Sequence, residues 1–269
     1  MSTCISAVQH IRRLRGGSQA QLLRASDGAY YVCKFLNNPQ HARVLANEML
    51  ATRLGLLLGL PLPQVEVVDV SAWFIEHSPD FRIDLPGTRI PCAPGRHFGS
   101  HYIEQPDSSL VVDYLPDEWL RSVSNIDDFA RVIVLDKWTC NADGRQAVFT
   151  RKKRQRKFSA TFVDQGYCFN AGEWSFPDSP LRGVFAKNSV YENVRGWDAF
   201  EPALTRAEGM AVDEIWEMAR SIPPEWYAFD SDGLHRLVET LHLRRSIIRE
   251  LITEFRSSSR NPFPLWTSK

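Results

Sequence analysis

Polar residues crowd into the stretch Asp136-Lys-Trp-Thr-Cys-Asn141-Ala-Asp143-Gly-Arg145-Gln146-Ala-Val148-Phe149, and a second polar group follows in Phe162-Val163-Asp164-Gln165-Gly166. An apolar helix, opened by the capping pattern Ser124-x-x-Asp127 and continuing to about Trp138, is predicted to lead into the first stretch. Asp164 stands after apolar residues and two positions before a glycine, so its carboxylate can end a strand and face a bound magnesium ion. We therefore expect the two stretches to meet at one polar site.

Phosphoryl transfer is a chemistry that such a site can serve, because it needs a cation on the phosphates, an oxygen ligand for magnesium and a carboxylate that orients the acceptor hydroxyl. Lys34 is the candidate cation, on a predicted strand behind a glycine-containing turn. Glu48 lies in an otherwise apolar helix and can hold the Lys34 ammonium in place. Upstream, Gly16, Gly17 and Ser18 can bring backbone amides close to phosphates. A solvated lysine, a solvent-facing glutamate and a simple turn are the plainer interpretations of these features.

The first part of the chain is predicted to be rich in strands. Two apolar runs from Gln21 to Phe35 flank Ser26-Asp27-Gly28, a turn cluster that suits a β-hairpin. The other elements expected here are a helix over 43–60, ended by Gly59 and Pro61, and strands over 65–70 and 109–115. Between Ser78 and Gln105 proline and glycine accumulate without a period, which favours a long surface loop.

The remainder is predicted to be mainly helical, with a hairpin over 148–163 and helices near 199–207, 211–221 and 233–256. Strands before helices indicate an α+β fold with two lobes: a strand-rich lobe over residues 1–116 and a helical lobe over 117–269. Ligands commonly bind in the cleft between two lobes. The hairpin tip, residues 151–157, is basic; a solvated turn is the plainer explanation, and docking to RNA or an acidic protein is the alternative.

The bulk properties are those of an ordinary globular protein. Among 269 residues, Lys plus Arg and Asp plus Glu both total 32, so no overall field attracts nucleic acid or an anionic membrane. The five cysteines include no C-x-x-C pair, which favours neither a disulfide framework nor a zinc ribbon and suits a reducing cytosol. We find no signal peptide and no apolar run approaching the ~18 residues of a membrane span, and therefore expect a cytoplasmic protein. A metal site from Cys92, His97, His101 and Glu104 is a weaker alternative, because their Pro- and Gly-rich setting presets no geometry.

Together these segments resemble the HipA-like kinases, a branch of the protein-kinase-like fold, over roughly residues 14 to 260. Asn47-Glu48 through Leu60-Pro61-Leu62-Pro63 looks like the family's lysine-partner helix and the strand entry after it. The family's catalytic segment aligns without gaps to residues 134–149. Ile222-Pro223-Pro224-Glu225-Trp226 resembles a carboxy-terminal family signature.

The resemblance implies a cytoplasmic bacterial kinase that binds ATP and Mg2+ and phosphorylates a serine or threonine of a protein. By that match Asp143 takes the catalytic position, Arg145 replaces the usual histidine and Asp164 binds the metal. The backbone of Asp113, Tyr114 and Leu115 would form the adenine-binding hinge, and Glu48, on the family's lysine-partner helix, would pair with Lys34.

One position departs from the family pattern. Five residues after the catalytic aspartate the family has a metal-binding asparagine, and here that residue is Val148. Asn141 lies five residues after Asp136, so an alternative register would make Asp136 the base. Gln146 or Asn141 could instead reach the metal while Asp143 stays catalytic. We prefer Asp143, because Asp136 falls within the apolar helix. The departure leaves three hypotheses: a magnesium-dependent kinase, a pseudokinase that binds nucleotide and regulates a partner, or a non-catalytic adaptor.

Overall fold

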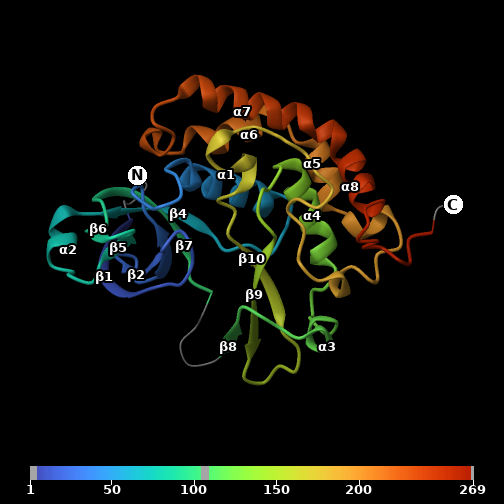
Figure 1. The fold of residues 1–269 in the computed structure, drawn as a ribbon, viewed down its shortest axis with the longest axis horizontal. Coiled ribbons are helices and arrows are strands. Elements are labelled where there is room, and N and C mark those ends of the chain that lie inside the picture. Colours follow the sequence, from blue (N-terminus) through green and yellow to red (C-terminus); the bar gives the residue numbers. More distant parts are fainter. Residues whose placement is uncertain (1–4, 104–108, 268–269) are drawn as a thin grey trace.

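The computed structural model describes residues 5–103 and 109–267 and confirms the α+β, two-lobed prediction. Strands gather in an amino-terminal barrel on the left of Figure 1, and the helices cover the opposite half of the molecule. Each half has its own apolar core: one inside the barrel, and a larger one that joins the first long helix to the carboxy-terminal helices.

The barrel closes in the order β1-β2-β3-β7-β4. Its strands are β1 (Ile5–Arg13), β2 (Gln21–Ala25), β3 (Tyr30–Lys34), β4 (Val65–Val70) and β7 (Gly95–His101). A short helix, α2 (Ala72–Glu76), and a two-stranded hairpin, β5 (Arg82–Leu85) and β6 (Thr88–Pro91), accompany it.

The predicted hairpin of residues 21–35 is confirmed as β2 and β3, which pair antiparallel. Gly28 sits in its turn at φ +85°, a conformation that glycine adopts without strain. Gln21 pairs with Arg13 of β1 on one side and with Cys33 of β3 on the other. The loop between β1 and β2 therefore lies at the strand ends next to Lys34.

The long helix α1 (Arg43–Leu57) packs between the barrel and the helical half. It stops as predicted: Gly59 takes φ +81°, and the amides of Gly59 and Leu60 donate to the carbonyls of Leu56 and Gly55. An added Cβ at position 59 would lie 2.4 Å from Nη1 of Arg206, so that flexible side chain would have to shift. The helix thus ends at Leu57, before the predicted end at Leu60, and Gly59 terminates it as expected.

A three-stranded sheet projects below the helices in Figure 1. It has the order β10-β9-β8, from β8 (Ser109–Val112), β9 (Gln146–Lys152) and β10 (Ser159–Val163), so the predicted hairpin over 148–163 is confirmed. The predicted strand over 109–115 ends at Val112 and pairs with β9, not with the barrel. The lobe boundary near Pro116 stays a prediction.

The helical half is built around α4 (Asp128–Trp138), whose Trp138 is fully buried and donates its indole N–H to the Leu241 carbonyl at 2.8 Å. Its other α-helices are α3 (Asp117–Leu120), α5 (Ala203–Gly209), α6 (Val212–Arg220), α7 (Ser231–Arg244) and α8 (Ile248–Arg256). Short 3-10 segments lie at Cys168–Glu173, Asn188–Val190, Trp197–Phe200, Pro224–Tyr227 and Arg245–Ile247. Within the described ranges, no helix is both long and apolar enough to cross a membrane.

Three local predictions were wrong. The region 78–105, expected to be a loop, contains β5, β6 and β7, and β1 was not predicted at all. The expected capping pattern does not open α4, which begins at Asp128, because the Ser124 hydroxyl bonds to Ser159 instead of to the helix. The predicted helix over 233–256 is interrupted by the 3-10 segment between α7 and α8.

Candidate functional site

The centre of the candidate site is the Lys34 ammonium at the end of β3. It forms ion pairs with Glu48 of α1 and with Oδ1 of Asp164, the latter at 2.8 Å. Lys34 and Asp164 are 130 residues apart in the sequence. The structure therefore brings together three residues that the sequence analysis selected on three separate segments.

Burial and charge set the protonation of this triad. Burial raises the pKa of Glu48, with the Asp164 charge acting in the same direction. For Asp164, burial is outweighed by the Lys34 ammonium, which holds the pKa of that carboxyl below its ordinary value. The two carboxylates likewise outweigh burial and raise the pKa of Lys34. The side chains of Lys34 and Glu48 are 8% and 3% exposed, and that of Asp164 is 35% exposed, so Asp164 alone of the three faces solvent substantially.

Backbone contacts fix Asp164 against α1. The Gln165 amide donates to Oε2 of Glu48 at 2.9 Å, and the Asn47 side chain donates to the Gly166 carbonyl at 2.9 Å. Asp164 itself has φ +63°, in the left-handed region that costs a non-glycine residue free energy. Gly166 has no room for a side chain, since a Cβ there would lie 2.6 Å from Cγ1 of Val44. The backbone conformation and the residue at position 166 are therefore both restricted in the turn after β10, beside the triad.

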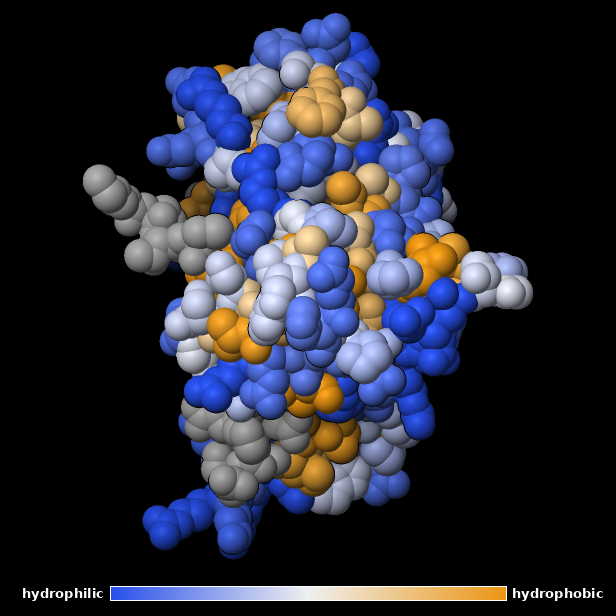
Figure 2. All heavy atoms as spheres, turned by 90° about the vertical axis from the view of Figure 1, so that its left-hand side faces the viewer, coloured by the Kyte–Doolittle hydropathy of each residue, from blue (hydrophilic) through white to orange (hydrophobic). Residues whose placement is uncertain are grey.

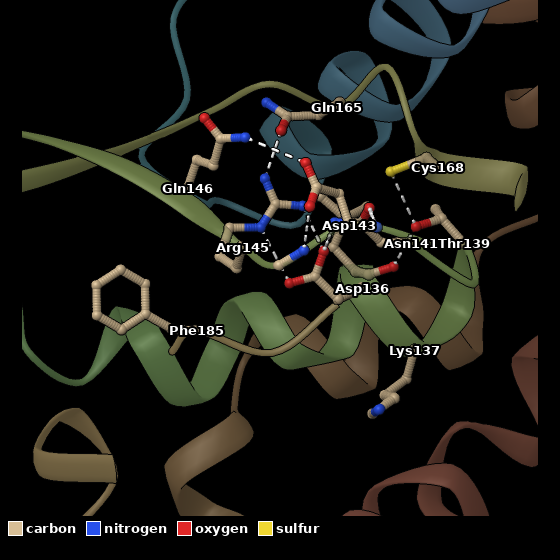
Figure 3. Close-up of polar contacts among 12 residues, drawn as sticks. Asp136, Lys137, Thr139, Asn141, Asp143, Arg145, Gln146, Gln165, Cys168 and Phe185 are labelled. Carbon is tan, nitrogen blue, oxygen red and sulfur yellow. Dashed lines mark hydrogen bonds and ion pairs between the residues drawn. The ribbon is translucent and has the colours of Figure 1, made fainter. Parts of the chain in front are cut away.

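A second buried cluster, shown in Figure 3, joins the two polar stretches. Arg145 forms an ion pair with Asp136, its Nε donating to Oδ2 at 3.0 Å, and both side chains are fully buried. The same guanidinium donates to the Val163 carbonyl at 3.1 Å and to the Gln165 side chain. Arg145 therefore connects the end of α4 to the residues on either side of Asp164.

The two candidate bases have different surroundings. Asp136 is 1% exposed and accepts hydrogen bonds from Arg145 and from Asn141, at 2.9 Å from the latter. Asp143 is exposed, and its carboxylate accepts from the Gly144 amide at 2.7 Å and from Gln146 at 3.2 Å. Because a general base must reach an acceptor hydroxyl, the exposed Asp143 suits that role and the enclosed Asp136 does not.

Asn141 is buried in the loop between α4 and β9. Its amide donates to Asp136, and its carbonyl oxygen accepts from the Asp143 amide at 3.1 Å. Across the described ranges, no group of three or more His, Cys, Asp or Glu side chains could hold a metal ion. Asp164 is the one predicted metal ligand that the structure leaves open to solvent.

The predicted hinge lines a pocket of about 510 Å³ beside this cluster. Its lining comes from the predicted hinge, the first half of β9 with the residue before it, the end of β10 and the segment 185–187. The lining residues are Asp113, Tyr114, Leu115, Arg145, Gln146, Ala147, Val148, Phe149, Val163, Phe185, Ala186 and Lys187. Lys187 holds the hinge in place, because its ammonium pairs with Asp117 at 2.7 Å and lies 4.7 Å from the Tyr114 ring centroid. Val148, at the position where the family has asparagine, faces this pocket.

The predicted phosphate loop lies between β1 and β2. Gly16 has φ +128°, and the Gln40 side chain fills the space beside Gly17, 3.1 Å from where a Cβ would stand. Gly16, Gly17 and Ser18 do not line the hinge pocket. Strand pairing alone places them near Lys34, so their contact with phosphates stays a prediction.

The alternative metal cluster does not form from the residues that the structure describes. His97 is fully buried, its Nδ1 accepting from the Leu36 amide and its Nε2 bonding to the Ala93 carbonyl, so neither ring nitrogen is available. Burial lowers the pKa of His97 to about 4, which keeps the ring neutral. Glu104 lies outside the described residues.

The fold and this site define a protein of the protein-kinase-like class. The chain belongs to the HipA-like kinase family, whose model matches residues 7–258. None of the curated proteins matches its sequence.

The solved structures that share the fold include the following three. The Helicobacter pylori proinflammatory kinase CtkA has a TM-score of 0.54 and 13% identity, covering 90% of this chain and 98% of its own. The Golgi casein kinase has a TM-score of 0.53 and 12% identity, and the match covers 94% of this chain and 74% of that kinase chain. The HipA of Shewanella oneidensis MR-1, solved with HipB and operator DNA, has a TM-score of 0.52 and 12% identity. That match covers 94% of this chain and 69% of the other chain. At these identities the similarity concerns the fold alone.

Proposed function

We propose that the protein is an ATP- and magnesium-dependent kinase that transfers the γ-phosphoryl group to a hydroxyl, a serine or threonine of a protein. The observation that carries the proposal is the triad in which Lys34 is held between Glu48 and Asp164. A lysine fixed by a helix glutamate is the cation that kinases place on ATP phosphates. Membership of the HipA-like kinase family supports the same reaction.

Each residue then has one role. Glu48 fixes Lys34, Lys34 binds the phosphates, and Asp143 orients the acceptor hydroxyl and takes its proton. Asp164, with its carboxylate ionised and partly open, would hold the magnesium ion, which neutralises negative charge on the phosphates when bound. The adenine would lie against the backbone of Asp113, Tyr114 and Leu115, and the amides of Gly16, Gly17 and Ser18 would approach the phosphates.

A pseudokinase is the second candidate, and a specific observation favours it. Val148 replaces the family's metal-binding asparagine, and the side-chain oxygen of Asn141, the atom that could bind a metal, already accepts a hydrogen bond from the Asp143 backbone amide. With Asp164 as the sole side-chain ligand, the site can bind a nucleotide without transferring its phosphoryl group. In that case the chain would act on a partner through its nucleotide-bound conformation.

Labelled ATP separates the two candidates. Wild-type protein, incubated with [γ-32P]ATP, magnesium and mixed protein acceptors, should transfer label to serine or threonine, and Asp164→Ala should not. Transfer by neither protein, together with ATP binding by the wild type, would establish the pseudokinase. Equal transfer by both would overturn the site assignment.

A further inference from the structure

The turn that joins β9 to β10 carries the densest positive charge in the sequence, and neither the fold nor the proposed reaction uses it. Six of the seven residues from Arg151 to Lys157 are Lys or Arg, although the whole chain has a net charge of zero. Figure 1 places this turn at the lower end of the molecule, and Figure 2 shows hydrophilic side chains projecting there. We call residues 151–157 the basic tip.

Most of these charges have no partner among the residues that the structure describes. Arg151 is the exception, since its guanidinium lies over the rings of Phe158 and Trp119, at 4.8 and 5.6 Å from their centroids. The other cations are exposed and form no ion pair among residues 5–103 and 109–267: Lys152, Lys153, Arg154, Arg156 and Lys157. Gathering like charges on one turn costs free energy through repulsion, and an anionic partner would relieve that cost.

The neighbouring surface narrows the choice of anion. Trp119, which lies under the Arg151 guanidinium, is followed by Arg121, and this cation is already paired with Glu192, so it adds no unpaired charge to the tip. Specific protein–DNA interfaces bury about 1,000–2,500 Å² of protein surface, and even single modules bury about 600–1,000 Å². A single turn matches a short run of carboxylates better.

Strand β9 connects the tip directly to the proposed catalytic loop. It runs from Gln146, whose side chain donates to Asp143, to Lys152, the first exposed cation of the tip. At roughly 3.3 Å per residue, these seven residues span about 20 Å. An extended peptide advances by a similar distance per residue, so the span corresponds to roughly six or seven peptide residues.

We propose that the basic tip is a docking site for the protein substrate, and that it binds an acidic run about six or seven residues from the phosphorylated serine or threonine. This inference rests on the proposed kinase function. It names the class of substrate: proteins in which an acidic segment flanks the acceptor hydroxyl at that distance.

The test uses fluorescent serine peptides with a block of four glutamates two, seven or twelve residues from the serine, on either side, and a peptide with glutamines instead. The tip variant is Lys153→Gln/Arg154→Gln/Arg156→Gln. The matched control, Arg24→Gln/Arg195→Gln/Arg236→Gln, removes the same charge from exposed arginines elsewhere. Anisotropy measures peptide binding, and labelled ATP measures phosphorylation.

We expect the seven-residue spacing to give the lowest KM, and the tip variant to raise that KM roughly tenfold while kcat changes less than twofold, as for the loss of a few exposed charge contacts. The control variant should behave as wild type. Asp164→Asn should bind the peptide normally without phosphorylating it. Tip-dependent binding without phosphorylation by any protein would therefore refute the kinase and retain the docking site.

Equal peptide affinity of the tip and control variants would overturn the proposal, as would equal binding of the glutamine peptide. Single-stranded RNA of random sequence provides the remaining arm. Tip-dependent, salt-sensitive binding of this RNA, with peptide phosphorylation unchanged by the tip variant, would assign the tip to nucleic acid instead.

Discussion

Arg145→Ala should destabilise the protein more than loss of any surface ion pair, because Arg145 and Asp136 are fully buried. Removing the arginine leaves the Asp136 carboxylate with only Asn141 as a side-chain donor, and it also removes donors from the Val163 carbonyl and Gln165. Breaking a buried ion pair by deleting one partner costs about 3–5 kcal/mol. A domain of this size is stable by about 5–15 kcal/mol, so the variant should fold but unfold at a much lower denaturant concentration.

Urea unfolding followed by tryptophan fluorescence measures this loss. Arg121→Ala is the matched control, because its partner Glu192 is also bound through two hydrogen bonds, but the two side chains are 53% and 43% exposed. We expect the control to lose less than about 1 kcal/mol. The double variant Asp136→Leu/Arg145→Met should lose less than the two single variants added together, since it leaves no unpaired charge. An Arg145→Ala loss no larger than that of Arg121→Ala would refute the reasoning.

Three further predictions concern the site and its support. Gly166→Ala should cost about 1–3 kcal/mol and abolish the ATP-induced thermal shift, because its Cβ would collide with Val44; an unchanged shift would contradict the narrow geometry. Asp143→Asn should retain ATP binding and lose phosphoryl transfer, whereas full activity of this variant in the labelled-ATP assay would exclude Asp143 as the base. His97 is held neutral down to about pH 4, while in the unfolded chain it binds a proton below about pH 6.5. Stability should therefore fall as pH drops from about 6.5 to about 4, by up to roughly 3 kcal/mol from this group, and be independent of His97 above that window. His97→Gln should remove that part of the slope in urea titrations, and identical slopes would show that the ring charges in the folded state.

The helix ends and hairpins were predictable because local residues specify them. Gly59 ends α1, and Asp27-Gly28 turns β2 into β3, as expected. The strands of region 78–105 were missed because their prolines and glycines indicate a loop. In β7, Gly99 is instead required by packing, since a Cβ would lie 2.6 Å from Cγ2 of Val68 on the neighbouring strand β4. Strand β1 is mostly exposed and lacks the apolar alternation that identifies a strand.

For the candidate site, the sequence predicted which residues take part, but only some of the contacts between them. Lys34, Glu48 and Asp164 were selected because phosphoryl transfer needs them. The buried pair of Asp136 with Arg145 was missed, although an aspartate inside an apolar helix was a signal that it needs a cation. That Gln165 and the Val163 carbonyl complete the cluster depends on the contact between α4 and β10, which no local pattern encodes.

A thermal-shift titration with ATP and magnesium tests the triad most directly. The wild-type melting temperature should rise with ATP concentration, and neither Lys34→Ala nor Asp164→Asn should show that rise. If both variants respond to ATP as the wild type does, the nucleotide is not bound at Lys34 and Asp164.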